Sequence, residues 1–197
     1  ALEKAALVSA TNIEGFYSDS KVMLACDMSG SMQHAVSANS KTMYYELGNM
    51  LAMLLQSRCE KVITGIFADN WKVVNHSHTS VLGNTCSISS RIGEVGYGTY
   101  GGKPLEWLIN EKIEVDKVMF FTDCQFWGET NFKDYFEGLW DKYKKISPNA
   151  KLYLFDLVGY GHSPIDFPRE DVVLIAGWSD HVFDMIAAIE NGSDTIK

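Results

Sequence analysis

Five short runs of β-branched, aromatic and other apolar residues recur along the 197-residue chain, and stretches with helical periodicity lie between them. The runs are KVMLACD at 21–27, KVITGIFAD at 61–69, KVMFFTD at 117–123, KLYLFDLV at 151–158 and DVVLIAG at 171–177. Strands that are apolar almost throughout are buried on both faces, as in a parallel sheet covered by helices. The sequence therefore predicts an α/β fold with a doubly wound, mostly parallel, Rossmann-like sheet.

Helices are predicted where apolar residues recur three and four positions apart. Three such faces consist of Met43, Leu47, Met50, Leu51 and Leu54; of Phe132, Tyr135, Phe136, Leu139, Trp140 and Tyr143; and of Val182, Phe183, Ile186 and Ile189. We expect Thr130 or Asn131 to cap the second of these helices. Pro104 is a favoured first residue of a further helix.

The segment WKVVNHSHTS at 71–80 alternates in polarity and follows FADN closely. It therefore predicts a strand that turns back antiparallel to the one before it, at an edge of the sheet. His76 and His78 are expected to share one face of the end of this strand. Two histidines without a third ligand indicate a solvated edge rather than a metal site.

Composition limits the classes of protein to which the chain can belong. With 46% hydrophobic residues it can bury one substantial core, so we expect a single domain over 1–197, with 1–20 as an N-terminal extension. A formal charge of −8, from 17 basic and 25 acidic residues, repels nucleic acid. Apolar runs of membrane-spanning length and a secretory leader pattern are absent from the sequence, so no membrane partner is expected. Four scattered cysteines indicate reduced, buried thiols, and we expect a cytoplasmic protein.

The stretch LACDMSGSMQ at 24–33 ends an apolar run in Asp27 and then places Ser29 and Ser31 around a glycine. Asp123 ends another apolar run, and Thr99 lies in the glycine-rich stretch GYGTYGG. Ligands of doubly wound folds bind at the carboxyl ends of the strands, so these five side chains converge if the two strands are neighbours. Two carboxylates with three hydroxyls suit a hard cation, Mg²⁺ or in its place Mn²⁺ or Ca²⁺, and do not suit zinc.

Other chemistries fit the same residues less well. Enzymes that form an aspartyl phosphate need a second Asp two residues on, where Ser29 stands. A P-loop fails because Lys103 is followed by Pro104. GYGTYG at 96–101 matches G-x-G-x-x-G, but a dinucleotide site needs a strand directly before it, and SISSRIGEV is too polar to be one. Metal-assisted phosphate chemistry and nucleotide binding remain as alternatives.

DMSGS at 27–31 resembles the D-x-S-x-S signature of von Willebrand factor A (vWA) domains. In that family the metal-ion-dependent adhesion site (MIDAS) takes further ligands from a Thr in a second loop and an Asp after a later strand, and Thr99 and Asp123 stand in those places. The resemblance implies a non-enzymatic, magnesium-dependent binding domain. One coordination position would remain for an acidic group on a protein or peptide partner.

A narrower resemblance covers several segments from end to end of the chain. ALEKA, KVMLACDMSGSM, GTYGGKPLEW, FFTDCQFWG and AGWSDHVFDMI are similar to parts of the A-type domain of the Ro autoantigen (TROVE) family. Proteins of that family join such a domain to a ring of helical repeats that binds small noncoding Y RNA. The 197 residues show no repeat array of that kind, so residues 1–20 either pack on the domain or lead to such a module. Direct RNA binding is not expected of this chain.

Overall fold

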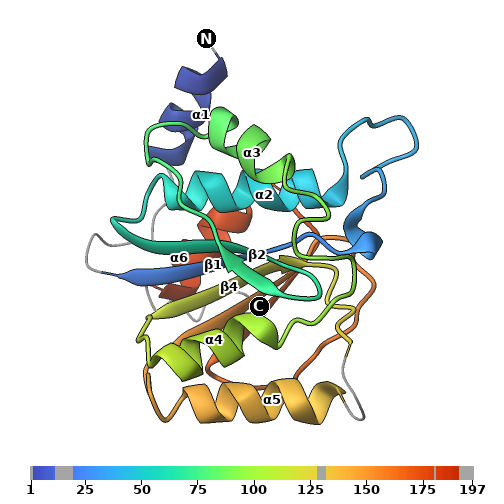
Figure 1. Cartoon of the computed structure of the whole chain (residues 1–197). Coiled ribbons are helices and arrows are strands. Elements are labelled where there is room, and N and C mark those ends of the chain that lie inside the picture. Colours follow the sequence, from blue (N-terminus) through green and yellow to red (C-terminus); the bar gives the residue numbers. More distant parts are fainter. Residues whose placement is uncertain (1, 12–19, 128–131, 180, 191–197) are drawn as a thin grey trace.

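A six-stranded sheet forms the centre of the protein in a computed structural model that describes residues 2–11, 20–127, 132–179 and 181–190 (Figure 1). The strand order is β3-β2-β1-β4-β5-β6. The strands are β1 (Lys21–Asp27), β2 (Lys61–Phe67), β3 (Trp71–Val73), β4 (Lys117–Thr122), β5 (Lys151–Asp156) and β6 (Val172–Ala176). All neighbours are parallel except β3, which runs antiparallel to β2 at the edge, so the predicted architecture is confirmed.

Helices cover both faces of the sheet, with α2 and α3 on one side and α4 and α5 on the other (Figure 1). Their bounds are α1 (Leu2–Thr11), α2 (Tyr44–Gln56), α3 (Leu82–Ser89), α4 (Lys103–Glu111), α5 (Phe132–Tyr143) and α6 (Val182–Glu190), with a short 3₁₀ turn at Gly30–Met32. None of the helices in these described ranges combines the length and apolar character of a membrane span.

Side-chain alternation along the strands divides the core into two layers. In β1, Val22, Leu24 and Cys26 face the layer of α2 and α6, whereas Met23 and Ala25 face that of α4 and α5. Successive side chains of a strand point to opposite faces, so a strand with apolar residues at every position serves both layers. This explains why the strands read as continuous apolar runs.

The order of the strands places a binding edge beside β1. From β1 the chain proceeds to β2 on one side, and it later returns to place β4 on the other side. The loops after β1 and β4 therefore diverge at a topological switch point, where doubly wound folds bind ligands. The strands that end at Asp27 and just before Asp123 are neighbours, which is the condition for the five predicted side chains to converge.

Helix α1 packs on α2, and its Ala6, Leu7 and Ala10 belong to the apolar layer that α2 and α3 also form. The Glu3 carboxylate accepts hydrogen bonds from the backbone N–H groups of Val81 and Leu82 at the start of α3. Because helix N-termini leave N–H groups without intrahelical partners, Glu3 supplies a cap from a distant part of the chain. The N-terminal helix is thus held against the sheet domain.

Some local predictions were wrong or lie outside the described residues. Strand β3 ends at Val73, so His76 and His78 do not share a strand face; they lie in the following loop, where Nδ1 of His78 is 3.0 Å from the Gln56 carbonyl oxygen. Of the four free cysteines, Cys86 is exposed rather than buried. The expected cap at residues 130 and 131 lies outside the described ranges.

Candidate metal centre

Three loops meet at the carboxyl ends of β1 and β4 and carry all five residues of the predicted site. The N–H of Gly30, in the loop after β1, donates a 2.8 Å hydrogen bond to the carbonyl of Tyr97, two residues before Thr99. The N–H of Trp127, in the loop after β4, donates a 2.7 Å bond to the carbonyl of Thr99. The backbone therefore fixes the Thr99 loop between the other two.

Asp27 is fully buried at the end of β1, and both of its carboxylate oxygens accept hydrogen bonds. Oδ1 accepts from the N–H of Ser29 at 2.9 Å, and Oδ2 accepts from the hydroxyl of Thr122 at 2.6 Å. Thr122 is the last residue of β4, and its Oγ1 also accepts a 3.1 Å bond from the N–H of Cys124. These bonds leave Asp27 one orientation.

Burial raises the pKa of Asp27 to about 7. Hydrogen bonds from Ser29 and Thr122 act against this effect, while the nearby charge of Asp123 adds to it. The ionised form of Asp27 is therefore disfavoured by its surroundings, and a positive charge in the site would favour it.

Hydroxyl groups lie beside these carboxylates. The Oγ atoms of Ser29 and Ser31 are 3.1 Å apart, with Ser29 fully buried and Ser31 partly exposed. Thr99 is 3% exposed, which places a polar side chain in a protected position at the end of the sheet. Neutral oxygen donors of this kind are ligands of hard cations.

The glycine-rich stretch around Thr99 accommodates the side chain of Asp69, which follows β2. Its carboxylate accepts hydrogen bonds from the N–H groups of Tyr97 at 3.1 Å and Gly98 at 3.0 Å. Gly96 has a φ of +94°, and a Cβ there would collide with the Asp69 carboxylate. The glycines are therefore explained by the shape of the loop that presents Thr99.

Asp123 is fully buried directly after β4. Its Oδ1 accepts a 3.0 Å hydrogen bond from the N–H of Gln125, whereas its Oδ2 is buried with no partner in the described part of the protein. Leaving a buried carboxylate oxygen unsatisfied is costly, so such an atom is typical of a ligand position. The donor set fits Mg²⁺ or a similar hard cation, and the ligand roles of the five residues stay predictions.

The described residues contain no group of three or more His, Cys, Asp or Glu side chains placed to hold a metal ion. A site rich in hydroxyls would not produce such a group, because three of its five members are Ser or Thr. The arrangement is thus unlike a zinc centre.

Sequence reasoning missed two residues of the site, Thr122 and Asp69. Thr122 stands beside Asp123 at the end of a strand, and the pairing of β4 with β1 gives it a partner there. Asp69 follows β2, and only the fold brings it under the glycine-rich loop. In the sequence, the one feature that could have identified them is that both stand at the ends of predicted strands.

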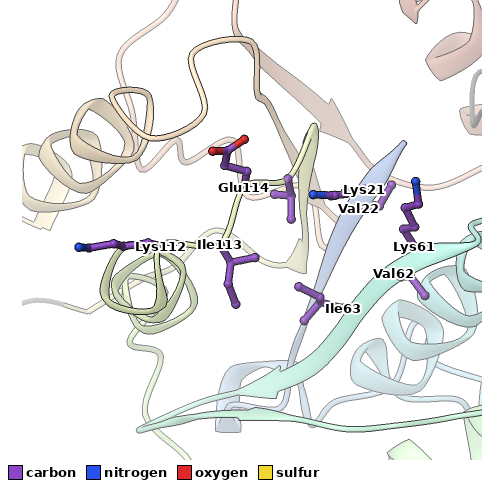
Figure 2. A pocket seen from close by; sticks show the side chains of 9 residues that line it. Lys21, Val22, Lys61, Val62, Ile63, Lys112, Ile113 and Glu114 are labelled. Atoms are coloured by element: carbon purple, nitrogen blue, oxygen red, sulfur yellow. The ribbon is translucent and has the colours of Figure 1, made fainter. Parts of the chain in front are cut away.

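A hollow lies at the edge of the sheet opposite the candidate metal centre, where β1 and β2 begin (Figure 2). Val62, Ile63 and Ile113 line it, and three lysines with Glu114 lie around them. Figure 2 shows that the ammonium groups of Lys21, Lys61 and Lys112 lie apart from one another and do not converge on one point. The hollow therefore offers no convergent charged site, unlike the edge at Asp27.

Comparisons with known proteins bear on the fold and the family. The family model described as the Ro60 vWA domain matches residues 21–189. A solved structure, the Deinococcus radiodurans RO (RSR) protein, superposes with a TM-score of 0.72 at 20% identity, over 97% of this chain and 38% of that one. This chain thus spans well under half the length of that protein.

Two further solved structures are similar over 87% of the chain at 16% identity. One is an aerotolerance-related membrane protein from Bacteroides fragilis with multiple mutations to serines, of which 88% is covered at a TM-score of 0.47. The other is proximal thread matrix protein 1 from the mussel byssus, of which 44% is covered at a TM-score of 0.46. Comparison with curated protein sequences finds no match.

Proposed function

The chain belongs to the Ro60 vWA domain family, and on that premise we propose that it is a non-enzymatic binding module that holds a divalent cation at the Asp27 edge. The cation, Mg²⁺ or a similar ion, would offer an open coordination position to an acidic group on a protein partner. The buried Oδ2 of Asp123, which has no partner among the residues that the structure describes, is the observation that carries this proposal.

The hydrogen bonds indicate which side chains would bind the ion directly and which would bind it through water. Asp123 Oδ2 and the hydroxyls of Ser29, Ser31 and Thr99 would hold the ion directly. Asp27, whose oxygens already accept from Ser29 and Thr122, would act through its remaining lone pairs or through a water molecule. With one carboxylate behind water, the ion keeps more of its charge for an incoming acid.

The two buried cysteine thiols at this edge favour a binding role over covalent catalysis. Burial raises the pKa of the Cys124 thiol, and the charges of Asp156, Asp123 and Asp27 raise it further. Burial likewise raises the pKa of Cys26 well above its usual value, with Asp27 adding to the effect. A thiol that stays protonated is a poor nucleophile, so neither residue suits covalent chemistry.

Capture of protein partners by the immobilised chain, in Mg²⁺ and in chelator, tests the function. Thr99→Ala should weaken capture without unfolding the domain, whereas Thr85→Ala should leave capture unchanged, because the Thr85 hydroxyl donates to the Val81 carbonyl directly before α3. Ser29→Asp should keep the metal but capture poorly, because an added carboxylate neutralises the ion.

Magnesium should also raise the melting temperature of the wild type, because a ligand that binds only the native state stabilises it. Asp27→Ala should lose this response. The metal-bridged mechanism is wrong if the same partners bind in chelator, or if Ser29→Asp captures them as well as the wild type does. Turnover of a phosphoester that Asp27→Ala abolishes would assign metal-assisted phosphate chemistry instead.

A further inference from the structure

Two large aromatic side chains are exposed beside the candidate metal centre. Tyr97 and Trp127 are each 60% exposed, and they lie on the two loops that the Trp127–Thr99 backbone bond joins. Apolar side chains that remain exposed around a buried polar centre are typical of a binding surface.

The backbone under both aromatic residues is fixed rather than free. Tyr97 donates its N–H to Asp69 and accepts from Gly30, and Trp127 donates its N–H to Thr99. The Tyr97 ring also lies over Gly93, where a Cβ would come within 2.6 Å of the tyrosine hydroxyl. Aromatic side chains presented in this way lose little conformational entropy when a partner packs on them.

A hollow next to Asp123 extends this surface. Its lining includes Cys124, which follows Asp123, together with Phe126, Trp127, His162 and Pro164. Its volume of about 370 Å³ suits one large side chain. A group that enters it would lie beside any acid bound at the metal.

The charges at this edge favour a peptide over a nucleic acid. Lys103 pairs with Glu106, Lys133 with Asp166, and Arg91 with Glu94. Single-stranded nucleic acid needs a basic groove beside its stacking platforms, and these bases are already paired in a chain of net charge −8. The acids Asp69 and Asp156 are likewise engaged with backbone N–H groups.

We propose that the partner segment carries its acidic residue next to apolar side chains, which pack on Tyr97 and Trp127 and enter the hollow between Trp127 and Pro164. This inference rests on the proposed function, since the acid binds through the metal. It adds a sequence requirement on the partner that the metal alone does not impose.

Fluorescence anisotropy with three labelled heptapeptides tests the inference on the whole chain in Mg²⁺. One peptide has a central Asp flanked by Phe, the second the same Asp flanked by Ser, and the third a central Asn flanked by Phe. We expect the Phe-flanked Asp peptide to bind about tenfold more tightly than either of the others, and to be released by chelator.

Substitutions then locate the surface. Trp127→Ala should reduce the preference for Phe flanks to about twofold or less and leave Mn²⁺ affinity unchanged, because the backbone N–H that holds Thr99 remains. Trp178→Ala is the matched control: Trp178 is 52% exposed and follows β6, two strands beyond β4, so its loss should change neither quantity.

The outcomes separate the two proposals. Equal, magnesium-dependent binding of the Phe-flanked and Ser-flanked Asp peptides would overturn this inference and leave the metal-bridged function standing. Binding of Mn²⁺ without binding of any of the peptides would have the same consequence. Binding of the Asn peptide as tight as that of its Asp counterpart would overturn both proposals, because the acid would then play no part. Tighter binding of a labelled oligouridylate than of any peptide would assign this surface to RNA.

Discussion

The hydroxyl of Thr122, the last residue of β4, donates a 2.6 Å hydrogen bond to Oδ2 of Asp27, the last residue of β1. The two residues are 95 positions apart in sequence, yet the bond is completely buried. It joins the two strands at the switch point and orients the carboxylate of the predicted site. Thr122 is therefore a positioning residue for the proposed metal centre.

Replacing Thr122 with Val should destabilise the fold by about 1–3 kcal/mol, because the buried Asp27 oxygen and the Cys124 N–H both lose a partner. It should also weaken Mn²⁺ binding, since Asp27 is no longer held in place. Urea denaturation and calorimetric titration with Mn²⁺ measure the two effects.

Thr64→Val is the control for this experiment. The Thr64 hydroxyl makes an equally buried 2.6 Å bond to Gln56, remote from the site. It should cost comparable stability and leave Mn²⁺ affinity unchanged. If Thr122→Val binds Mn²⁺ like the wild type, the positioning role is wrong.

Asp27→Asn should stabilise the metal-free protein at alkaline pH. Because the folded pKa of about 7 exceeds the ordinary value of 3.8, the folded state binds the proton more tightly than the unfolded state. The contribution of this group to stability therefore falls by up to about 4 kcal/mol as pH rises from about 4 to 7. Above about pH 7 it stays constant. The amide does not ionise and should show no such loss.

Denaturation of both proteins in chelator at pH 5 and pH 8 tests this prediction. The stability of the wild type relative to that of Asp27→Asn should be lower at pH 8. Parallel changes in the two proteins would show that Asp27 is not destabilised by its burial.

Glu190 at the end of α6 should contribute stability through a different, structural cluster. Burial raises its pKa, but hydrogen bonds from Lys117 and Tyr153 and the charge of Lys151 outweigh this effect, so the net pKa lies below its usual value. Such a carboxylate stabilises the fold above its unfolded pKa, and this stability is lost as pH falls through the folded pKa.

Glu190→Gln should therefore lower the free energy of unfolding at pH 7 by roughly 1–3 kcal/mol. The difference from the wild type should shrink as pH falls below about 4.5, where the unfolded carboxyl begins to protonate. Mn²⁺ affinity should not change. A pH-independent difference would mean that the loss comes from packing and not from the charge.

The central sheet could be predicted because burial on both faces produces apolar runs that local sequence displays directly. Asp27 and Asp123 stood out as acids at the ends of such runs, which places them at one edge once β1 and β4 pair. Helix α3 could not be predicted in this way, because LGNTCSIS has no apolar period and its N-terminus is capped by Glu3 from α1. The roles of Thr122 and Asp69 likewise depend on contacts that only the fold creates.

His76 and His78 show the limit of alternation as a guide to strand length. The alternating pattern continues past Val73, but bonding to β2 ends with the Val74 N–H, which donates to the Thr64 carbonyl, and the loop then bonds to the end of α2. Gln56 donates to the His76 carbonyl, and its own carbonyl lies beside the ring of His78. Tertiary contacts thus ended the strand earlier than its sequence suggested.

Anomalous diffraction at the manganese edge, from crystals grown in Mn²⁺, tests the metal centre most directly. We expect an anomalous peak between the loops of Asp27, Thr99 and Asp123, within coordination distance of Asp123 Oδ2 and the serine hydroxyls, and we expect it to be lost in crystals of Asp123→Ala. An occupied Mn²⁺ site elsewhere with no peak at this edge, or the same peak in Asp123→Ala, would contradict it.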